Sequence, residues 1–175
     1  MRYERLGRGL AAALFVCACL PAAGAAQDYQ LRAGRFQLGA GLGFTASPTT
    51  FALGFEGTYY FIDNFSITPR LAVGFDDGGT LLMLLADGRY HFDLNDYKLR
   101  ALKPFIGLGL GATFAFPEGP ADSDVAFTFG IPLGLDYYIT DGFSLGTEMQ
   151  FLIPIDLFDD NFIYHWQVLT ARYLF

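Results

Sequence analysis

The stretch FALGFEGTYYFIDNFSITPRLAVGF, residues 51 to 75, alternates bulky apolar side chains with small or polar ones on both sides of a short turn. In its first half Phe55 and Tyr59 lie on one face, and Glu56 and Thr58 lie on the other. Successive side chains of a β-strand point to opposite faces, so a period of two indicates a strand. The stretch therefore predicts two strands joined at residues 62 to 64.

The same alternation recurs along the chain. It marks strands at residues 35–44, 51–61, 65–75, 81–92, 104–116, 125–138, 143–153 and 162–175. No stretch after residue 26 has a convincing helical period. Pro69 and Pro132 fall inside these strands, and because proline cannot donate to the ladder, bulges at both sites fit the pattern. The prediction is an all-β protein, an antiparallel up-and-down barrel of eight strands.

The first 26 residues have the layout of a secretory signal peptide. Three arginines precede an apolar run, and a small-residue tail ends at Ala26. The run is too short to span a bilayer, since a helical span needs about 20 apolar residues. Cys17 and Cys19 fall inside it, so the mature chain is expected to lack disulfides. We expect residues 27–175 to form one barrel domain.

The mature chain is acidic. Without three arginines and one glutamate of the leader, the 11 basic and 18 acidic residues become eight and 17, a net charge of −9. This charge argues against nucleic acid as a partner, because phosphate binding needs a basic face.

The composition of the two strand faces indicates the solvent. A soluble ligand-binding barrel would place its bulky side chains inside and charged ones outside. Here the non-bulky face is mostly Gly, Ala, Ser and Thr, which suits a narrow lumen. The bulky face carries almost no ionisable groups, and a Lys or Arg at mid-bilayer would cost about 2–4 kcal/mol there. The bulky face is therefore expected to contact lipid.

The last residues, VLTARYLF, and KPFIGLGLGA at 103–112 resemble the small eight-stranded outer-membrane barrels of the OmpA and OmpX type. The resemblance implies a porin-like transmembrane β-barrel in the outer membrane of a Gram-negative-type cell envelope. Lipopolysaccharide and the other outer-membrane lipids would be its partners. It also implies that Phe175 is the signal read by the barrel-insertion machinery. Turns near 62–64, 93–103 and 140–142 would face the periplasm.

Aromatic residues flank the short turns. YYFIDNFSI at 59–67 reappears as YYITDGFSL at 137–145. Aromatic rings sit favourably at the boundary between headgroups and acyl chains, although Tyr and Phe also favour strands in general. The predicted girdle comprises Tyr59, Phe61, Phe65, Tyr90, Phe92, Tyr137, Phe143 and Tyr173.

Ionisable residues also occupy the face predicted to line the lumen. They are Glu56, Arg70, Asp87, Arg89, His91, Asp136, Glu148 and Arg172. Buried charges must pair. Two interpretations remain open: a salt-bridge network that fills the barrel, and a gated, narrow polar path.

Catalytic and metal chemistry have weak support. Some barrels of this family modify lipid A with a histidine and a serine, but His91 has no serine at a plausible same-face spacing. Carboxylates in the expected outer loops could attract divalent cations or form a solvated rim: Asp76, Asp77, Glu118, Asp122, Asp124, Asp156, Asp159 and Asp160. We expect no cofactor, no catalytic residue and no defined metal site. The leading prediction is a non-enzymatic structural or surface protein of the envelope; a narrow channel for small solutes and a lipid A-modifying enzyme follow.

Overall fold

The computed structural model describes residues 32–46, 49–76, 78–94, 99–118, 123–155 and 162–175. Its eight strands are β1 (Phe36–Ala46), β2 (Thr50–Ile62), β3 (Phe65–Asp76), β4 (Gly79–His91), β5 (Leu102–Pro117), β6 (Asp124–Tyr138), β7 (Phe143–Ile155) and β8 (Ile163–Leu174). The predicted strands are all present, with bounds that differ by at most two residues. The predicted signal peptide, residues 1–26, lies outside the described residues.

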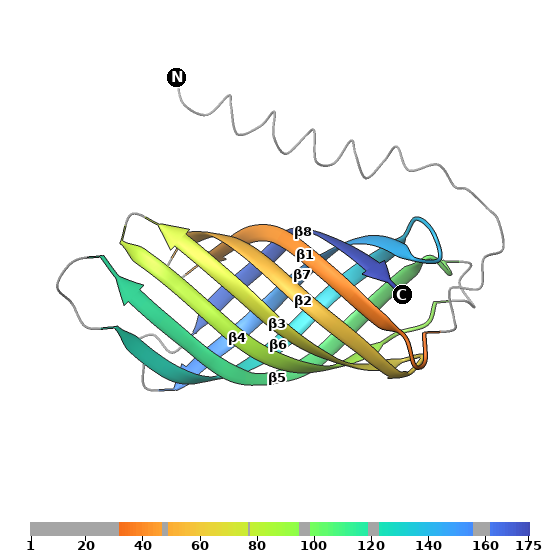
Figure 1. The fold of residues 1–175 in the computed structure, drawn as a ribbon, viewed down its shortest axis with the longest axis horizontal. Helices are drawn as coiled ribbons and strands as arrows, with labels where there is room; N and C mark the ends of the chain where they lie inside the picture. The colour runs from red at the N-terminus through yellow and green to blue at the C-terminus, as the bar shows by residue number, and fades with distance from the viewer. Residues whose placement is uncertain (1–31, 47–48, 77, 95–98, 119–122, 156–161) are drawn as a thin grey trace, which may run out of the picture.

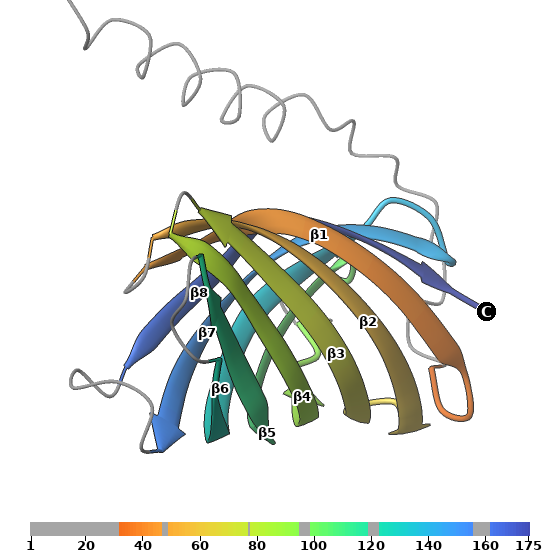
Figure 2. The same ribbon diagram turned by 60° about the vertical axis from the view of Figure 1, so that its left-hand side comes forward.

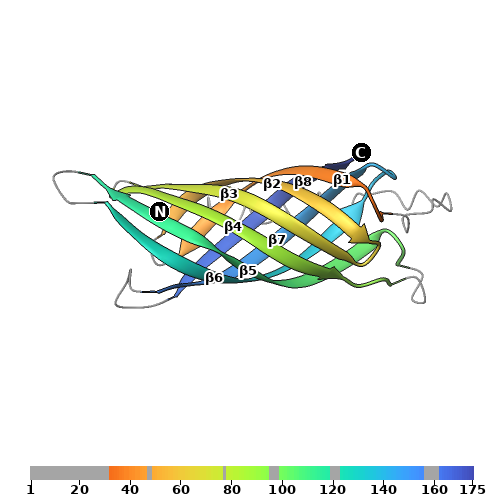
Figure 3. The ribbon, with the colours of Figure 1, turned by 60° about the horizontal axis from the view of Figure 1, so that its bottom comes forward.

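The strands form one closed sheet. Each pairs antiparallel with its neighbours in the chain, and β1 pairs with β8. Figures 1 and 3 show that β1 begins and β8 ends at the same end of the barrel, here called the terminal end. β2, β4 and β6 also end there and β3, β5 and β7 begin there, and the opposite ends of the strands define the loop end. The predicted eight-stranded up-and-down barrel is confirmed.

The two faces of the sheet differ as the alternation requires. On β2, Leu53 and Phe55 are 37% and 54% exposed, whereas the neighbouring Ala52 and Glu56 are buried. Figure 2 shows the tilted strands curving around a common axis, so the buried face of each lines a single lumen. Within the described part of the chain, no helix has the length and hydropathy needed to cross a bilayer.

The expected bulges at the two prolines are not found. The register is the same on both sides of Pro69 and of Pro132. Strand pairing therefore continues past each proline, and neither strand has an extra residue there. The register shifts elsewhere, most clearly at β8, where Val168 and Leu169 are both exposed. β1 and β7 both shift register opposite this point, so one irregularity in β8 affects both of its neighbours.

Candidate functional site in the barrel lumen

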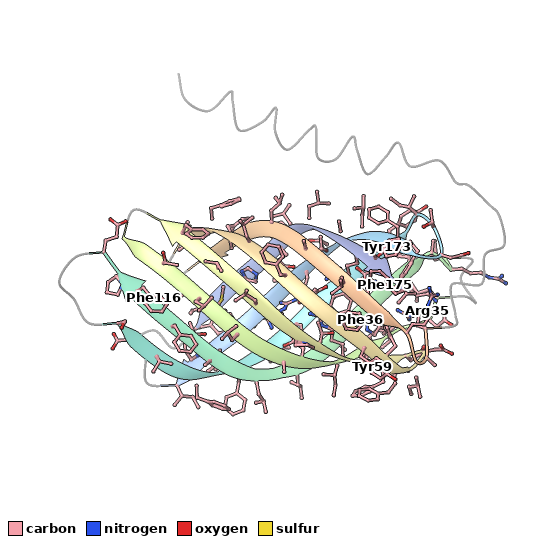
Figure 4. All side chains as sticks on the ribbon, in the orientation of Figure 1. Arg35, Phe36, Tyr59, Phe116, Tyr173 and Phe175 are labelled. Carbon is pink, nitrogen blue, oxygen red and sulfur yellow. The ribbon has the colours of Figure 1, made fainter. Side chains whose placement is uncertain are left out.

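The eight residues predicted to line the lumen are all buried on the inner face of the barrel. They are Glu56, Arg70, Asp87, Arg89, His91, Asp136, Glu148 and Arg172. Figure 4 shows nitrogen atoms gathered inside the barrel and carbon-rich side chains covering its outside. Seven of the eight form one continuous set of ion pairs, here called the ion-pair network; His91 does not take part.

Arg172 of β8 has the widest set of contacts. Its Nε donates to Glu56 of β2, and its Nη1 donates to Asp136 of β6. Its Nη2 lies 2.9 Å from Glu148 Oε2 on β7. A guanidinium presents five N–H donors in a planar fork, so one arginine can hold carboxylates from three walls of the lumen.

Arg70 and Arg89 reach the same carboxylates from β3 and β4. Arg89 Nη2 lies 3.0 Å from Glu56 Oε2 and 3.1 Å from both Asp87 Oδ2 and Glu148 Oε1. Arg70 Nη2 lies 2.9 Å from Glu56 Oε2 and also pairs with Glu148. The network therefore joins opposite walls of the barrel.

Two uncharged residues that were not predicted support the network. Gln150 accepts a hydrogen bond from Arg70 Nη1 at 2.7 Å and donates one to Asp87 Oδ1 at 3.2 Å. The ring of Phe105 lies beneath the guanidinium carbons of Arg89 and Arg172, at 4.9 and 5.6 Å. Both residues follow the strand alternation that places side chains in the lumen. The predicted lumen set contained only ionisable residues, so it included neither of them.

The network carries a formal imbalance. Its four carboxylates outnumber its three guanidiniums by one. Desolvating ions is costly, and attraction compensates only where geometry and hydrogen bonding are good. The several contacts of each guanidinium meet that requirement.

Toward the loop end the lumen is apolar. The buried cluster comprises Ala72, Leu81, Met83, Leu85, Leu152 and Ile163. The expectation of a small or polar inner face fails here, because bulky side chains fill this part of the barrel. On the same inner face the hydroxyl groups of Thr45 and Thr50 form a hydrogen bond with each other, and so do those of Thr113 and Thr128. The lumen is thus filled by apolar side chains as well as by ion pairs.

Toward the terminal end the lumen is aromatic. Tyr60 donates a hydrogen bond to Gln37 Oε1 at 3.0 Å, and Gln37 Nε2 lies 3.5 Å from the Tyr138 hydroxyl. Arg32, which precedes β1 and was not predicted, is buried against both rings.

One premise against catalysis is wrong. Ser66 Oγ lies 3.0 Å from His91 Nε2, although no serine was expected near that histidine. The two residues lie on adjacent strands, β3 and β4, and face the lumen together. Both are almost completely buried, and within the described part of the chain His91 Nδ1 has no hydrogen-bond partner, so none of the carboxylates described there orients the ring. The ring nitrogens of the other histidine, His165, also have no hydrogen-bond partner among the residues that the structure describes.

The aromatic residues predicted for the girdle lie on the outer face near the terminal end. They are Tyr59, Phe61, Phe65, Tyr90, Phe92, Tyr137, Phe143 and Tyr173. Figure 4 places Tyr59 and Tyr173 at that end, together with Phe36, which was not predicted. Neighbouring rings pack edge to face, as in Tyr90–Phe92 and Tyr173–Phe175.

A second aromatic set, not predicted, lies at the loop end. Its exposed members are Phe44, Phe51, Phe75, Phe116, Phe127, Phe162, Tyr164 and Trp166, and Figure 4 labels Phe116 there. The indole Nε1 of Trp166 donates to Thr147 Oγ1, which itself donates to the main-chain oxygen of Gln167. Thr147 therefore satisfies two polar groups beside the irregularity in β8.

Phe175 is held at the seam where the barrel closes. Its main-chain nitrogen donates to the Phe36 oxygen at 2.7 Å. Arg35 Nε donates to the Phe175 main-chain oxygen at 2.9 Å, and Arg35 Nη2 lies 3.4 Å from the Leu174 oxygen. The contact ties the start of β1 to the end of β8.

The structure offers no candidate metal centre among the residues it describes. Of the acidic loop residues, Asp77, Asp122, Asp156, Asp159 and Asp160 lie outside the described residues, as does the side chain of Asp76. Glu118 and Asp124 are exposed at the loop end.

Comparison with known proteins identifies the family. The model of the outer membrane protein beta-barrel domain family matches residues 10–169. The N-terminal β-barrel domain of Pseudomonas aeruginosa OprF is similar, with a TM-score of 0.63 and 17% identity over 82% of this chain and 98% of that chain. Neisserial surface protein A has a TM-score of 0.61 and 16% identity, over 79% of this chain and 95% of that chain. The Yersinia pestis attachment invasion locus protein Ail has a TM-score of 0.51 and 17% identity, over 82% of this chain and 99% of that chain.

No curated protein sequence is a match. The similarity to solved structures concerns the fold, and the family match covers most of the chain. The chain belongs to the outer membrane protein beta-barrel domain family and is an integral protein of the outer membrane.

Proposed function

We propose that this barrel is a non-enzymatic structural protein of the outer membrane whose lumen does not conduct. The observation that carries the proposal is the ion-pair network, in which Arg172 binds carboxylates from β2, β6 and β7. An ion that crossed the barrel would have to break several desolvated pairs at once. Breaking one buried pair costs about 3–5 kcal/mol.

The apolar cluster supports the same function. Leu81, Met83 and Leu152 fill the lumen on the loop side of the network. Water and ions gain no hydrogen bonds from such side chains, and a hydrophobic constriction can block a pore by dewetting. A solute would therefore meet an apolar section and a charged section in series, which argues against the alternative of a narrow channel.

The Ser66–His91 pair does not favour an enzyme. Its nucleophile would have to reach a lipid from inside a filled lumen, yet Ser66 and His91 are almost completely buried. A hydrolytic site also needs a group that orients the histidine, and no described residue offers a hydrogen bond to His91 Nδ1.

The outer surface supports the proposed membrane contacts. The two aromatic sets would lie at the two membrane boundaries, with the terminal end in the periplasm. The apolar face between them would contact the acyl chains of phospholipid and lipopolysaccharide. Phe175 would be read by the insertion machinery before the Arg35 contact closes the seam.

Conductance in planar bilayers tests the proposal. We expect the wild-type barrel to show no discrete openings, and Glu56→Ala combined with Met83→Ala and Leu152→Ala, which together disrupt the charged and the apolar sections, to introduce them. Asp141→Asn is the matched control, because this residue is exposed at the terminal end. Discrete wild-type openings that Glu56→Ala abolishes would show that the network conducts, and the structural proposal would be wrong.

A further inference from the structure

The terminal mouth of the lumen contains a guanidinium between two aromatic rings. The Cζ atom of Arg32 lies 4.9 Å from the ring centroid of Tyr60 and 5.9 Å from that of Tyr138. Both distances fall within the roughly 6 Å range of a cation–π contact. Arg32 is only 2% exposed, although it lies outside the strands.

Arg32 belongs to a short segment that bends into the mouth. The main-chain nitrogens of Arg32 and Ala33 donate to Asp63 Oδ1 at 2.6 and 2.9 Å. Gly34 donates to the Tyr60 oxygen at 2.7 Å with a φ of 76°, a conformation that glycine adopts without strain. A few hydrogen bonds therefore hold the segment. Tyr60 bonds to Gly34 and Arg35 of the segment on one side, but it also pairs with Ser66 of β3, and Tyr138 pairs with Ser144 of β7.

The described residues give the guanidinium of Arg32 no local counter-ion. Among the described residues no carboxylate forms an ion pair with it, and its Nε and Nη1 atoms have no hydrogen-bond partner. A buried charge needs compensation. The two ring faces provide part of it, and the ion-pair network provides the rest. The single excess negative charge of that network balances the one positive charge of Arg32.

The rings are positioned without Arg32. Tyr60 and Tyr138 belong to β2 and β6, and Gln37 of β1 bridges their hydroxyls through contacts of 3.0 and 3.5 Å. His91 packs against Tyr60 at a centroid distance of 5.1 Å. The aromatic pair would therefore persist if the segment withdrew, and it would face a lumen with one uncompensated negative charge.

We propose that the terminal mouth is an aromatic binding site for guanidinium cations, and that Arg32 is its intramolecular ligand. When residues 32–35 withdraw, the site accepts an alkylguanidinium cation from outside the barrel. The residues that bind it are Tyr60 and Tyr138, and the excess carboxylate charge of the lumen selects for a cation.

Titration calorimetry on the full processed chain in non-ionic detergent tests the site, with ethylguanidinium as the probe. Arg32→Ala is expected to bind it saturably, and the wild type at least tenfold more weakly, because Arg32 occupies the site. Arg32→Ala/Tyr60→Leu should lose the binding. Ethylurea, a neutral molecule of similar shape, should not bind to Arg32→Ala.

Arg35→Ala is the matched control. Arg35 belongs to the same segment, but its guanidinium donates to the main-chain oxygens of Phe175 and Leu174 at the seam. Its removal leaves Arg32 in the site, so binding should stay well below that of Arg32→Ala. Absence of saturable binding to folded Arg32→Ala, or equal binding of ethylurea, would overturn the proposal, and so would equal binding to Arg35→Ala.

If Arg32→Ala does not fold into a heat-modifiable barrel, Asp63→Ala provides a second test of the proposed site. This change removes the acceptor that holds the Arg32 and Ala33 main chain and leaves the Arg32 side chain in place. The segment should then withdraw more often, and ethylguanidinium should bind at least threefold more tightly than to the wild type. An affinity equal to that of the wild type would contradict the proposed displacement.

Discussion

Arg172→Met tests whether the ion-pair network stabilises the barrel. Methionine retains length in the lumen but removes the guanidinium that binds Glu56, Asp136 and Glu148. Glu56 and Glu148 keep contacts with Arg70 and Arg89. Asp136 loses the one ion pair that the described residues give it.

The expected loss of unfolding free energy depends on how many carboxylates lose all their ion-pair partners. Removing one partner of a buried pair costs about 3–5 kcal/mol. Because only Asp136 becomes fully unpaired, we expect a loss of unfolding free energy near the lower limit, about 3 kcal/mol. Adding Asp136→Asn removes the unpaired charge. The double variant should then be more stable than the sum of the single changes predicts, by about 1–3 kcal/mol.

Urea unfolding in lipid vesicles would measure these changes. Trp166 is the one tryptophan of the chain and lies on the outer face, so its fluorescence reports exposure to lipid. Arg35→Met is the control, because Arg35 lies outside the network. A loss below about 1 kcal/mol for Arg172→Met, or strict additivity with Asp136→Asn, would refute the stabilising role of the network.

Three further changes have definite outcomes. Gly43→Ala should reduce the folded, heat-modifiable fraction on detergent gels, because its Cβ would collide with the β8 main chain, whereas Gly88→Ala meets only ordinary contacts and should fold normally. Thr147→Val should destabilise the barrel by about 1–3 kcal/mol in urea unfolding and shift the indole emission, because two polar groups lose their partner in lipid. Cells that express Ser66→Ala or His91→Ala should show the wild-type lipid A acyl pattern by mass spectrometry; a changed pattern would favour an enzyme.

The alternation of side chains predicted the strands, and it predicted their faces except in the apolar part of the lumen. Glu56 and Leu53 separate correctly into lumen and lipid sides, because a strand has only two faces and each faces a different medium. The same rule placed all eight predicted ionisable residues on the inner face, but the set omitted Lys103, which is also buried there.

The contacts between lumen residues could not be predicted in the same way. Whether Ser66 contacts His91 depends on the register of β3 against β4. Which residues of distant strands face each other across the lumen depends on the tilt of the strands in the closed barrel. Arg32 lies outside any strand, so periodicity carries no information about it. The apolar cluster of Leu81 and Met83 contradicts the expected composition of a lumen, because filling space there matters more than polarity.

The contact between Arg172 and Glu56 joins residues that are 116 positions apart, on the last strand and the second. Until β8 docks against β1, Arg172 stays out of reach of Glu56, and a partly assembled sheet carries bare charges that the hydrocarbon core repels. Entry into the bilayer and closure of the seam should therefore occur together, in one cooperative step with a high kinetic barrier. Once closed, the same barrier should slow the escape of the protein from the membrane.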